Sequence, residues 1–245
     1  MHNYKMILQY EGTRYQGWQR QDTTNNTIQG KLEDILKKMT GTSVKIHGSG
    51  RTDAGVHAKA QVANFHLEEA YEPYKLMDYL NQYLPEDIRV IELEEVPERF
   101  HSRLIAKEKI YTYRIDQSKV ADVFLRRYSY HIDQKLDLEE MKKAANQLLG
   151  THDFKAFCSN RRMKKSTIRT IYQISIEQEG SILKLTYRGN GFLYHMVRLL
   201  TGTLLEVGLG KRSASSIPSI IESRERENAG TLAPAQGLIL EQVIY

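Results

Sequence analysis

Residues 47 to 59 read H-G-S-G-R-T-D-A-G-V-H-A-K, with three glycines around one arginine and one aspartate. Glycine permits backbone conformations that other residues avoid, and no apolar periodicity runs through the stretch. We therefore expect a loop here, between the strand-like runs that flank it. Arg51 and Asp53 lie two positions apart, so a locally extended backbone would point both side chains to the same side.

This loop has two chemical interpretations. An arginine beside a carboxylate keeps the carboxylate ionised and fixes its orientation, which a carboxylate nucleophile requires. Asp53 could instead be a turn or capping residue, the usual role of aspartate in a glycine-rich loop. The loop matches neither G-x-G-x-x-G nor G-x-x-x-x-G-K-[ST], so the common phosphate-binding fingerprints are absent. Spacing and residue type alone leave both interpretations of Asp53 open.

The segments that flank the loop alternate between strand and helix patterns. In the first half, strands are predicted at 4–10, 43–46, 61–67 and 88–93, with helices over 28–39 and 76–83, the second helix burying Leu76, Tyr79, Leu80 and Tyr83. Asn26 and Gln29 have the spacing of a capping box before the first helix. The order β-α-β-β-α-β is ferredoxin-like.

The second half repeats this order. Strands are predicted at 108–115, 171–176, 182–187 and 237–244, with helices over 138–149 and 192–207. Asp137 and Glu140 form a capping box for the first helix, which stops at Gly150, and Gly208 ends the second. No Pro- or Ser-rich linker separates residues 1–103 from residues 104–245. We therefore expect an α+β fold in which two ferredoxin-like halves share one continuous, mostly antiparallel sheet flanked by helices.

The composition indicates a globular protein with an anionic partner. The chain has 245 residues, and 40% are hydrophobic, enough to bury a core. Lys and Arg number 35 against 30 Asp and Glu, and a pI near 9.1 makes nucleic acid the first candidate partner, although many proteins are mildly basic. Cys158 is the single cysteine, which excludes an internal disulfide and fits a reducing compartment. The N-terminus lacks a signal-peptide core and no apolar run could span a membrane, so we expect a cytoplasmic protein.

The stretch G-R-T-D-A-G-V-H-A, residues 50 to 58, resembles the active-site motif of the TruA family of tRNA pseudouridine synthases. In that family the aspartate, here Asp53, is the catalytic residue. Residues 10 to 21, Y-E-G-T-R-Y-Q-G-W-Q-R-Q, are similar to the family's opening motif, with Glu11 in place of the usual Asp. Further motifs match at 100–103, 109–115, 189–198 and 232–240, so the resemblance runs from Tyr10 to Leu240 and implies the pseudouridine synthase fold.

The resemblance also implies partners for Asp53. K-I-Y-T-Y-R-I, residues 109 to 115, is similar to the family's R-x-Y-x-Y-x-I strand, which makes Tyr111 the active-site tyrosine. It could stack on a withdrawn uracil and handle a proton, or it could simply fill the core. Arg198 matches the family's second arginine, which would hold Asp53 ionised together with Arg51. Alternatively, Arg198 lies on a helix surface over apolar neighbours.

Several further residues are expected to contact RNA. Arg14, Trp18 and Arg20 in the opening motif could neutralise phosphates or stack on bases, although Trp18 could equally be a core anchor. The F-H-S-R motif contributes His101 and Arg103, which could also be a structural pair at a strand end. The basic run from 159 to 170 could contact phosphates or be solvated surface, and its candidates are Arg161, Arg162, Lys164 and Lys165. Leu240 could press on the target base or belong to the core.

The implied reaction is the isomerisation of uridine to pseudouridine at positions 38 to 40 of the tRNA anticodon stem-loop, by a homodimer. The reaction needs no cofactor and no metal. The pair His66 and Glu68 forms H-x-E, but no P-C-x-x-C follows, which argues against a zinc deaminase. Two alternatives remain: a non-catalytic RNA-binding protein with the same fold, and a synthase of this family that acts on a different RNA.

Overall fold

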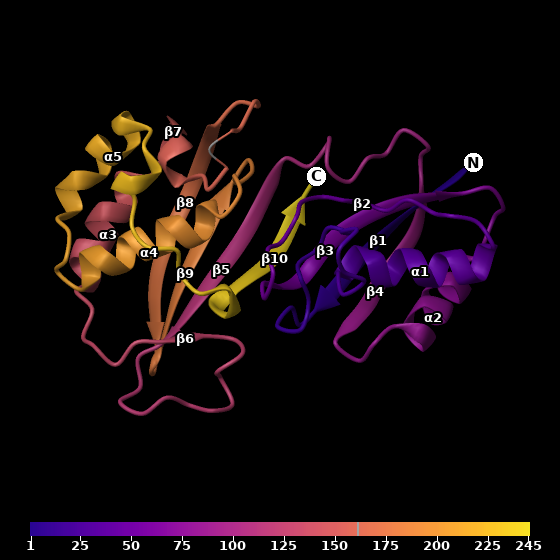
Figure 1. Ribbon diagram of the computed structural model, residues 1–245, viewed down its shortest axis with the longest axis horizontal. Helices are drawn as coiled ribbons and strands as arrows, with labels where there is room; N and C mark the ends of the chain where they lie inside the picture. The colour runs from indigo at the N-terminus through magenta and orange to yellow at the C-terminus, as the bar shows by residue number, and fades with distance from the viewer. Residues whose placement is uncertain (161) are drawn as a thin grey trace. The chain divides into compact units, whose positions relative to one another are not determined.

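The computed structural model describes residues 1–160 and 162–245, so Arg161, one of the predicted RNA contacts, lies outside the described residues. The chain forms two compact units (Figure 1). Met1–Lys107 together with Ile239–Tyr245 make the first, and Glu108–Leu238 make the second. The sequence placed the division after Arg103 and assigned the last strand to the second half. In the structure, the last strand pairs with a strand of the first unit.

The first strand lies inside the sheet of the first unit, with one strand on each side of it. β1 (His2–Tyr10) lies between β4 (Ile88–Val96) and β3 (His57–Leu67), antiparallel to both. The C-terminal β10 (Leu238–Ile244) pairs in parallel with β3, and the short β2 (His47–Gly48) pairs with β3 as well. Tyr4, Met6 and Leu8 are fully buried, so the alternation predicted for residues 4–10 is confirmed.

Two helices complete the first unit, and their details correct two predictions. α1 (Ile28–Thr40) begins after Thr27, whose Oγ1 accepts the Gly30 N–H at 3.2 Å. The prediction that Asn26 caps this helix is wrong, because its side chain donates instead to the Arg14 carbonyl. α2 (Pro73–Tyr83) buries Leu76 and Leu80, but Tyr83 is 56% exposed, because only one narrow stripe of this helix faces the core.

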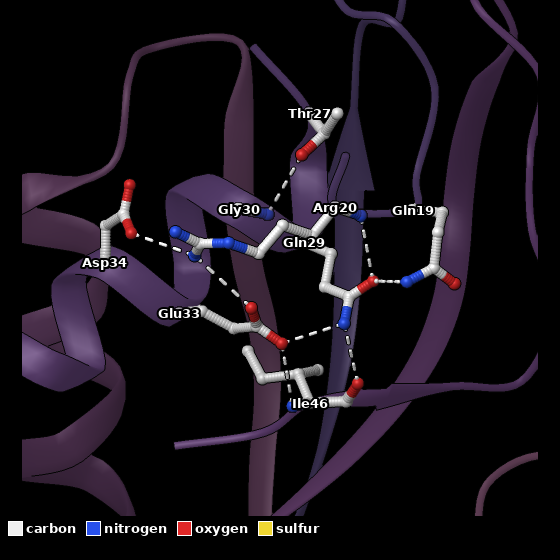
Figure 2. A network of polar contacts seen from close by, with 8 residues as sticks. All are labelled: Gln19, Arg20, Thr27, Gln29, Gly30, Glu33, Asp34 and Ile46. Carbon is white, nitrogen blue, oxygen red and sulfur yellow. Dashed lines mark hydrogen bonds and ion pairs between the residues drawn. The ribbon is translucent and has the colours of Figure 1, made fainter. Parts of the chain in front are cut away.

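The strand predicted at 43–46 is absent. Ile46 uses its backbone differently: its N–H donates to Glu33 Oε1 at 3.1 Å, and its carbonyl accepts from Gln29 Nε2 at 3.1 Å (Figure 2). Because side chains of α1 satisfy these backbone groups, no ladder partner is needed there. Pairing begins one residue later, at β2, where His47 lies opposite Asn64.

The sheet of the second unit is antiparallel over its main strands. β5 (Glu108–Asp116), β9 (Ile182–Gly189), β8 (Ile168–Glu179) and β7 (Gly150–Asp153) follow one another in this order. The short β6 (Tyr130–His131) runs parallel to β5. β8 and β9 form the predicted hairpin, with Glu179 opposite Ile182 and Gly180 at a φ of 61° in the turn.

The helices of the second unit are α3 (Leu138–Asn146), α4 (Met196–Gly208) and α5 (Ile217–Ser223). Asp137 caps α3 as predicted, accepting the N–H groups of Glu139 and Glu140. Gly150 does not end this helix; it starts β7 instead. α4 begins at Met196 rather than at Phe192, because His195 has a φ of 66° and so cannot be helical.

Each unit therefore combines a mostly antiparallel sheet with flanking helices, which confirms the predicted α+β class. Short 3₁₀ turns lie at Lys155–Phe157, Ala214–Ser216, Arg226–Asn228 and Ala235–Gly237. Within the described residues, none of the helices has the length and apolar character needed to cross a membrane.

Candidate active site

The loop from 49 to 56 carries Asp53 between β2 and β3. It closes through two backbone hydrogen bonds, from Ser49 N to the Val62 carbonyl at 2.7 Å and from Val56 N to the Asp53 carbonyl at 3.2 Å. Arg51 is exposed and Asp53 is half-buried, whereas the intervening Thr52 is buried. The loop therefore presents the arginine to solvent while its middle is fixed to the body of the unit.

A network of buried polar side chains supports the loop through hydrogen bonds. Tyr10 Oη and Thr52 Oγ1 lie 2.9 Å apart, and Gln61 Nε2 donates to the Gly50 carbonyl at 3.0 Å. Ser49 Oγ donates to Gln61 Oε1 at 2.7 Å. Burial raises the pKa of Tyr10, so its phenol stays protonated and can donate. The sequence pattern placed Tyr10 and Gln61 in strands, and so it missed their role in supporting the loop.

The opening motif packs directly against this loop. Trp18 N donates to the Thr52 carbonyl at 3.0 Å, and Gly55 N donates to the Tyr15 carbonyl at 3.3 Å. Gly17 has a φ of 89°, and a Cβ there would lie 2.7 Å from the Thr52 carbonyl oxygen. Trp18 is 2% exposed, which settles its two interpretations in favour of the core anchor. The opening motif thus supports the Asp53 loop by packing against it.

Arg14 and Arg20 are held by carboxylates. Arg20 Nη1 lies 2.9 Å from Asp34 Oδ1 and 3.3 Å from Glu33 Oε2, and hydrogen bonding by Asp34 raises the pKa of Arg20 (Figure 2). Arg14 Nε lies 3.1 Å from Asp87 Oδ2. These pairs tie the opening motif to α1 and to the start of β4. RNA contact by the two arginines stays a prediction.

His101 and Arg103 occupy a turn after β4. The centroids of the His101 and His47 rings lie 4.9 Å apart. The Nδ1 atom of His101 accepts the Arg103 N–H at 3.1 Å. Burial, together with the nearby His101, lowers the pKa of His47. Arg103 is exposed, so its side chain is available to a polyanion, while the turn itself is anchored by the buried Ser102, whose N–H donates to Asn64 Oδ1 at 2.9 Å.

Tyr111 lies on β5 in the second unit and is 7% exposed. Its ring meets the Phe192 ring edge-on, with centroids 5.3 Å apart and an interplanar angle of 87°. Tyr113 is fully buried two residues on, and its hydroxyl donates to the Pro234 carbonyl at 2.8 Å. Tyr113 therefore belongs to the core, whereas the packing of Tyr111 leaves both its stacking role and its core role possible.

Arg198 lies in the first turn of α4 and is half-buried. Its Nε donates to the Ala233 carbonyl at 2.7 Å, and the Ala233 N–H donates back to the Arg198 carbonyl at 3.2 Å. Glycine lets the 230–234 segment approach the helix, because a Cβ at Gly202 would lie 1.7 Å from the Thr231 oxygen. The carbonyl that receives Arg198 immediately precedes the one that receives the Tyr113 hydroxyl. The sequence predicted Arg198 but missed this segment as its support.

The other predicted contacts are more dispersed. Leu240 on β10 is 1% exposed opposite Ala58, which favours its core interpretation. Among the described residues of the 159–170 run, the exposed basic side chains are those of Arg162, Lys164 and Lys165. Asp53 belongs to the first unit, and Tyr111 and Arg198 to the second, so their meeting around a substrate stays a prediction. Among the described residues, no three His, Cys, Asp or Glu side chains are placed to hold a metal ion.

The fold and the Arg-Thr-Asp loop are those expected of a pseudouridine synthase, and comparison with known proteins supports this class. The family described as tRNA pseudouridine synthase matches residues 6–103 and 144–245. The chain therefore belongs to the tRNA pseudouridine synthase family, which confirms the resemblance found in the sequence.

Its relatives match over their whole length. The chain is 46% identical over 245 residues to a "tRNA pseudouridine synthase A 2" of Bacillus cereus, with 100% of both chains covered. It is 47% identical over 245 residues to a "tRNA pseudouridine synthase A" of Acetivibrio thermocellus, again with 100% of both covered. The structure titled "Crystal Structure of a Cbf5-Nop10-Gar1 Complex" covers 72% of this chain and 40% of its own at 16% identity. Its TM-score of 0.35 is too low to establish a shared architecture.

Proposed function

We propose that this protein isomerises uridine to pseudouridine in tRNA, at positions 38 to 40 of the anticodon stem-loop, with the Asp53 carboxylate as its catalytic group. The observation that carries the proposal is the R-T-D-A-G-V-H-A loop, held by buried hydrogen bonds in a chain that belongs to this family over most of its length. The names of its relatives support tRNA as the substrate. The reaction moves the glycosidic bond from N1 to C5 and consumes no second substrate.

Each proposed role rests on a property of the residue. Asp53 would attack the uridine or promote departure of the base, and either role requires an ionised carboxylate. Arg51 and Arg198 would hold that charge. Tyr111 would stack on the uracil and assist proton transfer, and its edge contact with Phe192 fixes the plane of its ring. C6 of the base, C1′ of the sugar and a glycal are the alternative points at which Asp53 would act.

The target uridine must leave its stack before Asp53 can reach it, at a cost of about a few kcal/mol. This cost is smallest in a loop or at a stem end, which supports the anticodon stem-loop as the substrate region. Arg103, Arg162, Lys164 and Lys165 are exposed and would contribute phosphate contacts, which position the RNA without reading its sequence. The homodimer and the cytoplasmic location stay predictions.

The test compares the wild-type protein with Asp53→Asn, which removes the charge and keeps the shape. Unmodified tRNA is incubated with each protein, and carbodiimide labelling with primer extension locates pseudouridine. We expect stops at positions 38 to 40 with the wild type and none with Asp53→Asn, although the variant still binds tRNA. Asp22→Asn is the matched control, because Asp22 is an exposed aspartate next to the opening motif.

The outcomes separate the alternatives. Stops at other positions, or only in another class of RNA, would indicate a synthase of this family with a different target. Binding of tRNA without stops for either protein would instead favour a non-catalytic RNA-binding protein. Full activity of a folded Asp53→Asn would contradict the proposed role of the carboxylate.

A further inference from the structure

The chain between β5 and β6 makes a long loop, residues 117–129, that exposes apolar side chains. Phe124 is 84% exposed and Val120 is 79% exposed, and Val123 and Tyr128 are exposed beside them. Figure 1 draws this loop extending beyond the lower end of the sheet in the second unit. Apolar side chains gathered on a surface in this way commonly mark an interaction site.

Internal hydrogen bonds fix the form of this loop. The buried Asp116, at the end of β5, accepts from Ser118 N at 3.0 Å, from Ser118 Oγ at 2.6 Å and from Asp122 N at 3.2 Å. Asp122 Oδ1 in turn accepts the Phe124 N–H at 2.8 Å. These hydrogen bonds hold the backbone of the loop up to Phe124, whose side chain is exposed.

The charge of the loop is positive. Lys119, Arg126 and Arg127 are exposed, and Asp122 is the single acidic residue between 117 and 129. One oxygen of the Asp122 carboxylate accepts the Phe124 N–H, and Arg126 Nη1 donates to the Val123 carbonyl at 2.6 Å, so the three cations outnumber the one acidic group. The loop thus presents cations and an aromatic ring on one short segment.

Aromatic rings beside cations are the pattern that binds unpaired bases and phosphates. A second copy of the chain fits less well, because a closed two-fold contact brings the same patch of each copy together and would oppose like charges. We propose that the loop of residues 117–129 is a tRNA-binding site, in which Phe124 stacks on an unpaired base while Lys119, Arg126 and Arg127 contact phosphates. This proposal rests on tRNA being the substrate.

The loop follows the end of β5 that lies away from Tyr111. Tyr111 pairs with Tyr187 on β9, whereas Asp116 pairs with Ile182 at the opposite end of the same ladder. Five residues along a strand span about 16 Å, at about 3.3 Å per residue, and the loop begins only after Asp116. The target uridine and the base at Phe124 are therefore different nucleotides, and we place the second one outside the anticodon stem-loop.

The experiment uses this separation. The kcat/KM of Phe124→Ala and of the wild type is measured on a full-length tRNA transcript and on the isolated anticodon stem-loop. We expect about a tenfold loss on full-length tRNA, the size of one lost stacking contact, and less than about a twofold change on the stem-loop. Tyr74→Ala is the matched control, because Tyr74 is 64% exposed on α2 next to the acidic Glu72, and it should change neither value.

A second variant tests the phosphate contacts. Lys119→Gln should reduce the slope of log binding constant against log salt by about one for full-length tRNA, with no change for the stem-loop. A folding defect would weaken the binding of both RNAs, so the comparison of the two substrates separates the two causes.

The proposal is overturned if Phe124→Ala retains wild-type values on full-length tRNA, or if both substrates suffer equally. It is also overturned if this variant sediments as a smaller species than the wild type, because the loop would then join copies of the chain. A wild-type protein that modifies neither RNA would refute the proposed function alone. The tRNA affinities of the two proteins would still decide whether the loop binds RNA.

Discussion

Gly17 adopts a φ of 89°, and a Cβ there would lie 2.7 Å from the Thr52 carbonyl oxygen, beside Asp53. We expect Gly17→Ala to strain the backbone and to push the catalytic loop away, lowering the free energy of unfolding by about 2–4 kcal/mol. We also expect kcat for tRNA isomerisation to fall by at least about tenfold, since small displacements of a reacting group are costly. Urea denaturation and single-turnover kinetics measure the two effects.

Gly41 provides the control for this prediction. Its φ is 73°, but a Cβ there would meet nothing within 4 Å. Gly41→Ala should therefore cost about 1 kcal/mol of backbone strain and leave kcat unchanged. Equal loss of kcat in both variants would show that general destabilisation, rather than the position of the loop, controls the rate.

Single residues also mark what the sequence could predict. Asp53, Tyr111 and Arg198 stand in recognisable motifs, and their roles remain predictions. The support of the Asp53 loop by Tyr10 and Gln61 could not be predicted, because alternation indicates that a residue faces inward but not which group its polar end reaches. Trp18 shows the same limit, because an aromatic residue among arginines fitted RNA stacking and a core anchor equally, and only its burial decides for the core.

At the scale of elements, the loop after β5 depends on the buried carboxylate of Asp116. Burial acts to raise the pKa of Asp116, but hydrogen bonds from Ser118 and Asp122 outweigh it and hold the pKa below its ordinary value of about 3.9. The ionised form therefore adds stability that is fully present above that ordinary value and is lost as the pH falls through the lower folded pKa.

Asp116→Asn tests this contribution. We expect the variant to unfold about 1–3 kcal/mol more easily than the wild type at about pH 7, because an amide cannot accept the same set of hydrogen bonds. The difference between the two proteins should shrink as the pH falls below about 4. Urea denaturation at a series of pH values measures this difference, and a constant difference at every pH would contradict the expected role of the charge.

The elements themselves were largely predictable, and the exceptions share a cause. The strands at 4–10, 88–93 and 182–187 follow plain alternation and are confirmed. The strand at 43–46 failed because side chains of α1 satisfy the backbone of Ile46. α4 starts late because His195 adopts a left-handed conformation that its sequence does not announce. In both places a tertiary or conformational feature overrides a local pattern.

At the scale of the whole molecule, the last seven residues complete the first unit. Ile239 and Leu240 on β10 pair with His57 and Ala58, and the Ile244 carbonyl accepts the Lys107 N–H at 2.8 Å. We expect a chain truncated after Leu238 to lose hydrogen-exchange protection in β1, β3 and β4, because β3 would lose its pairing with β10 and the buried side chains of that strand. Protection in β8 and β9 should change much less.

Tyr245→Phe is the control for the truncation. It removes only the hydrogen bond from the Tyr245 hydroxyl to the Ser102 carbonyl, 2.7 Å long, and keeps the ring contact with Phe100. A truncated chain that lost protection equally in both units, or in neither, would contradict this division of the chain. The order of elements was predictable, but the partner of the last strand was not, because periodicity identifies a strand without naming its neighbour.

The return of β10 to the first unit has a consequence for biosynthesis. The segment Glu108–Leu238 is continuous in sequence, whereas Met1–Lys107 must wait for Ile239–Tyr245. At roughly 5–20 residues per second, the ribosome needs on the order of ten seconds after Lys107 to deliver them. During that interval the nascent chain carries an open edge at β3, next to the loop that holds Asp53. The segment that is synthesised first is therefore the last to complete its fold.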